Sequence, residues 1–214
     1  MATSIRHRYR TQVRDEVKRA AVVQLAEGGP QALSINAIAK QLGVSGPALY
    51  RYFAGRDELL TELIIDAYDD LGEAIGDAAA RTHGRPARDR LRALARAYRD
   101  WAVAHPHRYG LLFGEPVPGY DAHAQRLVDA SQRAMNVLID VLDDAGAEAP
   151  SAALGRELER WARSRGIDVS APVALRAVQV WAQLHGFVSL EIGGNFTSMG
   201  LEPDKLFRAE LARL

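Results

Sequence analysis

Residues 33–53 read LSINAIAKQLGVSGPALYRYF, and this stretch carries the clearest structural pattern in the chain. Ser34 stands directly before an apolar run at helical spacing, so its hydroxyl is expected to accept a hydrogen bond from an amide of the first turn. Leu33 and Ile38 are placed to form a hydrophobic staple around that cap. Gly43 can adopt the left-handed conformation that ends many helices. The residues expected on the buried face of this helix are Ile35, Ile38, Ala39 and Leu42.

The same pattern of a capping serine and a hydrophobic staple recurs two residues later and predicts a second helix. Ser45 can cap it, and Pro47 falls in its first turn, where the missing N–H costs little. Val44 and Leu49 are placed for a second staple, and Leu49 and Phe53, four residues apart, face the core together. The connection between the two helices is so short that they must cross sharply. This arrangement is typical of a helix-turn-helix whose second helix can enter a DNA major groove.

Several side chains of the second helix are left for the surface. Arg51 can donate two hydrogen bonds to guanine O6 and N7, or hold a phosphate. Gly46 would allow close backbone approach to DNA, and Tyr50 offers a hydroxyl and a ring edge. Gly55 begins the next helix, and Arg56 stands at its first position, where helix amides favour a phosphate. These residues predict a DNA-binding surface.

The stretch resembles the N-terminal domain of the tetracycline-repressor (TetR) family over about residues 10–65. The resemblance rests on Ile38-Ala39, Gly43-Val44-Ser45, Leu49-Tyr50-Arg51-Tyr52-Phe53 and Arg56-Asp57-Glu58-Leu59-Leu60. It implies a small DNA-binding domain followed by an all-helical domain for ligand binding and dimerisation. It also implies that the DNA surface includes Ser34, Ser45, Gly46, Pro47, Tyr50, Arg51, Tyr52 and Arg56. Three positions depart from the family pattern, since Ala48, Gly55 and Arg56 stand where threonine, serine and lysine are usual.

The rest of the chain also follows helical periodicity, interrupted by glycine and proline. The expected helices lie around residues 13–25, 60–75, 91–102, 106–113, 127–142, 152–165, 173–192 and 206–214, with a loop at 114–119. Alternating strand patterns of useful length are lacking. We therefore expect an all-α fold, in which a three-helix helix-turn-helix domain (1–56) precedes a larger C-terminal helical bundle (57–214).

Charge is distributed unevenly along the 214 residues, although the chain has no net charge. Residues 1–60 contain nine Lys and Arg against five Asp and Glu, whereas the remainder holds 18 against 22. A basic end on an acidic body suits a protein that touches DNA phosphates at one end. The chain has no cysteine, no apolar core like that of a signal peptide, and no run of 18 apolar residues. We expect a cytosolic protein without disulfides and without a membrane association.

The C-terminal region gives weaker indications of function. Trp181 and His185 share a helix face and resemble a Trp-x-x-x-His-Gly motif of one TetR subset, although a structural role in the core is favoured for both. Gly186 in mid-helix indicates close helix packing, and the helix at 173–192, with the terminal helix, is expected to form a homodimer. An apolar or amphipathic small effector is expected. Its candidate pocket residues are Tyr98, Trp101, Phe113, Met135, Leu138, Trp181 and His185.

Two other classes of protein remain open at this stage. An all-helical enzyme is disfavoured because the chain lacks a P-loop, a Rossmann glycine motif, a G-x-S-x-G elbow and an H-E-x-x-H pair. A metal site at His105, His107, His123 and Asp121 is also disfavoured, because their spacing crosses Pro106 and a loop. A helical adaptor that binds only protein is the second alternative. The sequence favours a DNA-binding regulator, most simply a repressor, with no cofactor and no catalytic residue.

Overall fold

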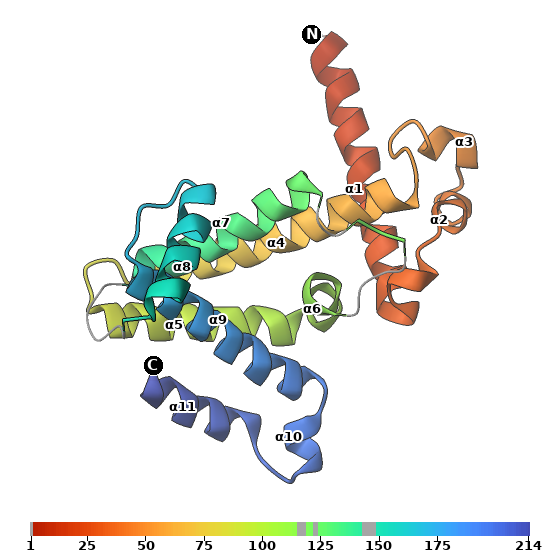
Figure 1. Cartoon of the computed structure of the whole chain (residues 1–214). Coiled ribbons are helices and arrows are strands. Elements are labelled where there is room, and N and C mark those ends of the chain that lie inside the picture. Colours follow the sequence, from red (N-terminus) through yellow and green to blue (C-terminus); the bar gives the residue numbers. More distant parts are fainter. Residues whose placement is uncertain (1, 115–118, 122–123, 143–148) are drawn as a thin grey trace. The chain divides into compact units, whose positions relative to one another are not determined.

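The computed structural model describes residues 2–114, 119–121, 124–142 and 149–214. Every regular element within these ranges is a helix, as the sequence predicts (Figure 1). The elements are α1 (Ala2–Gly28), the 3-10 turn η1 (Pro30–Ala32), α2 (Ile35–Gln41), α3 (Gly46–Leu49), α4 (Arg56–Arg81), α5 (Ala87–Ala104), α6 (Pro106–Phe113), α7 (Gln125–Val141), α8 (Ala152–Ser164), α9 (Ala171–Ile192), α10 (Asn195–Ser198) and α11 (Pro203–Arg213).

The chain divides into two compact units. The N-terminal unit comprises Met1–Ala67 and His107–Leu127, and the C-terminal unit comprises Tyr68–Pro106 and Val128–Leu214. The division falls inside α4 and α7, so each of these helices contributes to both units. The N-terminal unit therefore includes α6 as well as the helix-turn-helix. The domain boundary after residue 56 stays a prediction.

The core of the N-terminal unit forms where α1, η1, α2 and α3 pack together. The apolar side chains that the helical spacing directs inward are buried, among them Val17, Ala21, Ile38, Leu49 and Phe53. Burial of each valine, leucine, isoleucine or phenylalanine among them stabilises the unit by about 1.5–3 kcal/mol. Leu42 is only half-buried, because it is the residue at which α2 ends.

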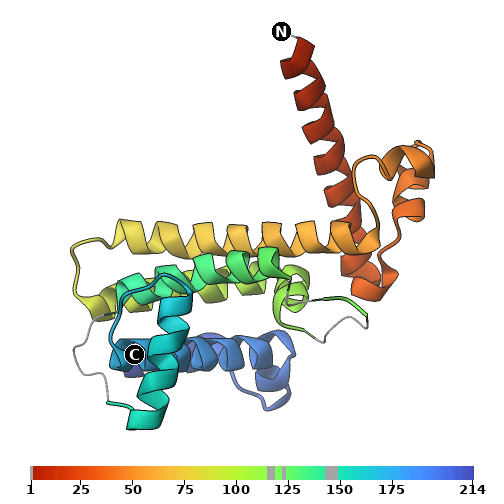
Figure 2. The same ribbon diagram turned by 45° about the horizontal axis from the view of Figure 1, so that its top comes forward.

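The C-terminal unit is a helical bundle in which α9 contacts both α5 and α8 (Figure 2). Side-chain hydroxyls cap two of these helices: Ser151 accepts from the amide of Leu154 and Ser170 from that of Val173, each at 3.4 Å. The buried face of α9 repeats at helical spacing and comprises Val173, Ala174, Ala177, Val180, Leu184 and Val188. Within the described ranges, no helix combines the length and the hydropathy needed to span a lipid bilayer.

Candidate nucleic-acid interface

The first helix of the motif, α2, is capped as its sequence predicts. The Ser34 hydroxyl accepts a hydrogen bond from the Ala37 amide at 3.3 Å, and its own amide donates to Gln24 Oε1 at 3.0 Å. The second bond ties the start of α2 to α1. Gly43 follows the helix with φ of +68°, the left-handed conformation expected there. The local signals therefore set both ends of α2.

The second helix of the motif, α3, differs from the prediction in three respects. It spans only Gly46–Leu49, and residues 50–52 continue as turns. The Ser45 hydroxyl makes no capping bond, because Pro47 offers no N–H and the Ala48 amide donates instead to the Ser45 carbonyl at 2.9 Å. Val44 keeps 43% of its surface exposed, although a staple with Leu49 was expected to bury it.

Buried and exposed side chains separate clearly around α3. Leu49 and Phe53 are each 1% exposed, which confirms that they anchor the segment to the core. Of the predicted DNA-binding residues, four are exposed and four are half-buried. The exposed four are Ser45, Pro47, Tyr50 and Arg51, and the half-buried four are Ser34, Gly46, Tyr52 and Arg56. A Cβ added at Gly46 would lie 3.0 Å from Asn36 Oδ1 of α2, so a larger residue would crowd the two helices.

Arg56, at the start of α4, makes a hydrogen bond and an ion pair within its own chain. Its guanidinium donates to the Pro30 carbonyl at 2.8 Å and lies 3.4 Å from the Asp57 carboxylate. Glu58 accepts a hydrogen bond from the Ala54 amide, so both acids of the first turn have local partners. The contact of Arg56 with DNA stays a prediction, and that contact would have to share the guanidinium with Pro30.

Arg14 of α1 holds the end of the recognition segment, a role that the sequence analysis did not assign. Its guanidinium lies 4.3 Å from the centroid of the Phe53 ring and donates to the Tyr52 carbonyl. It also lies 3.0 Å from a carboxylate oxygen of Glu62 in α4. One side chain thus links α1, the segment after α3, and α4. In the sequence, Arg14 is one of several basic residues between positions 6 and 19, and nothing in that segment distinguishes it from its neighbours.

Glu62 is the centre of a cluster of cations. Besides Arg14, it lies 3.3 Å from Lys18 Nζ and 2.6 Å from Arg126, in the first turn of α7. Burial alone would raise the pKa of Glu62, but the hydrogen bond from Arg126, the charge of Lys18 and the remaining bonds outweigh it and hold the pKa below 4.5. Glu62 is therefore a carboxylate at neutral pH and joins three elements of the N-terminal unit.

The seven predicted pocket residues differ in burial. Tyr98, Trp101 and Leu138 are buried, whereas Phe113, Met135 and His185 are half-buried. Trp181 keeps 36% of its surface exposed, so in the single chain it is not the core aromatic that we expected. Its ring stacks on His185 at 5.6 Å, and burial lowers the pKa of His185. Phe113 belongs to the N-terminal unit and the other six belong to the C-terminal unit.

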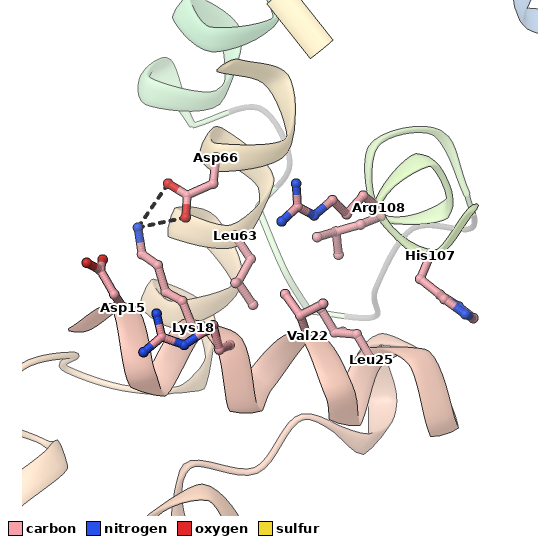
Figure 3. Close-up of a pocket in the computed structure, with 10 residues that line it drawn as sticks. Asp15, Lys18, Val22, Leu25, Leu63, Asp66, His107 and Arg108 are labelled. Carbon is pink, nitrogen blue, oxygen red and sulfur yellow. Dashed lines mark hydrogen bonds and ion pairs between the residues drawn. The ribbon is translucent and has the colours of Figure 1, made fainter. Parts of the chain in front are cut away.

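A cavity of about 300 Å³ lies between α1, α4 and α6 of the N-terminal unit, and none of the seven residues lines it (Figure 3). Figure 3 shows Val22 and Leu25 of α1 directed toward Leu63 of α4, with the Lys18–Asp66 ion pair beside them. The side chain of Arg108 extends from α6 toward α4 and also lines the cavity. The cavity therefore combines an apolar wall with charged groups.

The described ranges contain no group of three or more His, Cys, Asp or Glu side chains that could hold a metal ion. His123, one of the residues considered above, lies outside the described residues, and the His105 ring is engaged with Trp101. The exposed side chains Tyr50 and Arg51 make the surface around α3 the candidate site of function.

Two protein-family models match the chain. Residues 19–63 match the model described as bacterial regulatory proteins, tetR family. Residues 91–214 match the model described as tetracyclin repressor-like, C-terminal domain. The two matched ranges cover the helix-turn-helix and most of the C-terminal unit.

Individual relatives and a solved structure also match the chain. The HTH-type transcriptional regulator Rv1816 of Mycobacterium tuberculosis is 33% identical, covering 94% of this chain and 90% of its own length. The crystal structure of regulatory protein SCO4313 matches with a TM-score of 0.84 and 43% identity over 97% of both chains. The HTH-type transcriptional activator FasR of Mycolicibacterium smegmatis is 27% identical, covering 65% of this chain and 64% of its own.

Proposed function

Since the chain belongs to the TetR family of DNA-binding transcriptional regulators, we propose that it is a ligand-responsive repressor that binds an inverted-repeat operator as a homodimer in the cytosol. The exposed pair Tyr50–Arg51, held beside the buried Leu49 and Phe53, carries this proposal. Such a pair presents hydrogen-bond donors on a rigid support, which is what readout of base edges requires.

In the proposed complex, α3 enters the major groove with its exposed side toward the bases. Arg51 donates to guanine or to a phosphate, and Tyr50 supplies a hydroxyl and a ring edge. Because α3 is only four residues long, a single copy makes few base contacts. Two copies related by a two-fold axis double those contacts and require two half-sites about one helical turn of DNA apart.

Selection of bound sequences from a random duplex pool tests DNA recognition. The wild-type protein is expected to enrich an inverted repeat, and Arg51→Ala is expected to weaken binding to it by roughly 10- to 100-fold. Arg85→Ala is the matched control, because Arg85 is an exposed arginine of the C-terminal unit. Enrichment of no sequence by the folded protein would reject the proposal, and so would equal losses in the two variants.

The proposed dimer uses one side of α9. A Cβ added at Gly186 would meet no atom within 4 Å outside its own helix backbone, so the close packing expected around Gly186 is absent from the single chain. Leu190 stands four residues later, so it lies on the same side of the helix, and it keeps 45% of its surface exposed. An exposed leucine beside an unfilled glycine is suited to a second copy of the same helix, since an isologous interface places the same patch on both subunits.

Analytical ultracentrifugation of Gly186→Leu tests the dimer. The added side chain should wedge the two copies apart and raise the dissociation constant of the dimer more than roughly tenfold. Gly76→Leu is the control, since Gly76 of α4 is also a helical glycine with nothing within 4 Å of an added Cβ. A monomeric wild type, or a dimer that tolerates Gly186→Leu as well as the control change, would contradict this interface.

The effector is proposed to be apolar or amphipathic and to release the DNA. It acts by favouring a dimer whose recognition helices no longer match the spacing of the grooves. A reporter placed behind the selected operator tests the sign of regulation. Repression that is relieved by a small molecule is expected. Stimulated transcription would instead identify an activator, as FasR is named.

A further inference from the structure

The first part of α1 extends beyond the core of its own unit (Figures 1 and 2). Helix α1 begins at Ala2, and from residue 7 onward the first buried side chain is that of Val17. Residues 7–12 are all exposed, and Tyr9 keeps 64% of its surface. The sequence up to residue 14 contains arginines and no acid. The segment 7–12 is thus helical although none of its side chains is buried.

Arg14 sets the direction in which this extension faces. Because its guanidinium is held by the Tyr52 carbonyl, the Phe53 ring and Glu62, that side of α1 faces the recognition segment. Arg10 stands four residues earlier and therefore lies on the same side of the helix, one turn closer to the N-terminus. The orientation of Arg10 follows from an anchor that is internal to the unit.

Arg10 and Arg51 meet across a surface groove of about 350 Å³, which Tyr9 and Tyr52 also line. Two guanidinium groups and two phenol rings thus surround one depression. Among the described residues, neither Arg10 nor Arg51 has a carboxylate within ion-pair distance, whereas Arg14 has Glu62. Two like charges beside one groove repel each other unless an anion lies between them, so the groove is complementary to an anion.

We propose that this groove binds one phosphate of the operator backbone beside each half-site, and that α1 thereby lengthens the contact with DNA. The inference rests on the proposed function, because Arg51 belongs to the same segment that enters the major groove. Arginines bind phosphate oxygens through paired N–H groups, and tyrosine hydroxyls can donate to the same oxygens. A duplex backbone suits the groove better than a small free anion, because the groove is open and continuous with the DNA-facing surface around α3.

Arg10→Ala and Arg8→Ala provide a matched pair of variants. Both residues are exposed on the same helix and each change removes one positive charge, but Arg8 does not line the groove. We expect Arg10→Ala to weaken binding to the selected operator by roughly tenfold and to reduce the salt slope by about 0.9 for each half-site. Arg8→Ala is expected to lower affinity by less than roughly threefold, as a general charge effect. Urea unfolding of both variants tests whether they remain folded.

Operators with single methylphosphonate substitutions locate the contact. Neutralising one flanking phosphate should weaken the wild-type complex but leave the Arg10→Ala complex unchanged, whereas Arg8→Ala should respond as the wild type does. Equal losses of affinity in Arg10→Ala and Arg8→Ala would overturn the inference. So would a series of operators in which no phosphate substitution has an effect that depends on Arg10. Neither result would contradict the selected operator itself. If the wild type selects no operator, the proposed function fails instead.

Discussion

At the scale of single residues, the two serines of the helix-turn-helix show how a nearby proline decides whether a serine caps its helix. Both stand before a helix, and both have the residue type that caps best. The Ser34 hydroxyl reaches the Ala37 amide, but Ser45 is followed two residues later by Pro47, which removes one of the amides that a cap can bind. The same residue type is therefore a cap at one position and an open surface group at the other.

Substitution of these serines by alanine separates the two roles. Ser34→Ala should lower the free energy of unfolding by about 1 kcal/mol, because an amide of α2 loses its partner. Ser45→Ala should change it by less than about 0.5 kcal/mol. Urea denaturation of the DNA-free protein measures both values. A loss at Ser45 as large as that at Ser34 would contradict the structure.

Glu62 predicts a pH dependence of stability. Its pKa is lowered in the folded protein, so the stabilisation is complete above its unfolded pKa near 4.5 and is lost as the pH falls through the folded value. Glu62→Gln should therefore cost roughly 2 kcal/mol at pH 7 and progressively less below about pH 4.5. Glu73→Gln, at an exposed position of α4, is the control. A cost for Glu62→Gln that stays constant from pH 7 to pH 3 would exclude the ionic role.

At the scale of elements, Arg99 of α5 joins α9 and α11 within the C-terminal unit. Its guanidinium donates to Glu191 of α9 at 2.7 and 2.6 Å and to Asp204 of α11 at 2.6 Å. It also lies 4.9 Å from the Phe207 ring centroid. These bonds raise the pKa of Arg99 further, so it stays charged at any pH at which the protein folds. Helix α11 is thus held by charge as well as by apolar contact.

Removal of this side chain should loosen α11 before the rest of the unit. Arg99→Ala is expected to lower the free energy of unfolding by roughly 2 kcal/mol, since Glu191 loses a charged partner in a mostly buried site. Hydrogen exchange of α11 amides should accelerate more than that of α5 amides. Arg96→Ala, at an exposed position of the same helix, should leave both unchanged. Uniform acceleration in both helices would indicate that Arg99 is not specific to α11.

At the scale of the whole molecule, the uneven distribution of charge matters more than its sum. The chain has no net charge, yet the N-terminal 60 residues carry an excess of basic groups. Part of that excess is used internally, because Arg14 and Lys18 are paired with Glu62 and Asp66. Arg10 and Arg51 are exposed, and in the proposed complex they face the DNA phosphates.

A protein without net charge is therefore expected to bind its operator with strong salt dependence. If a dimer neutralises six phosphates, a plot of log K against log salt should have a slope near −5, on the basis of about 0.9 for each phosphate. Fluorescence anisotropy between about 50 and 300 mM salt measures the slope. A slope near zero would mean that the protein does not neutralise DNA phosphates when it binds.

The amino-acid sequence by itself determined the all-helical fold, the position of the helix-turn-helix, the caps of α2 and the family. These features depend on residues three or four apart, whose relation is the same in any helix. Only the tertiary structure revealed that Arg14 holds Tyr52, that Arg56 is occupied by Pro30, that Trp181 is exposed, and that α1, α4 and α6 enclose a cavity. Contacts across many residues depend on how helices pack, and neither spacing nor residue type specifies that packing.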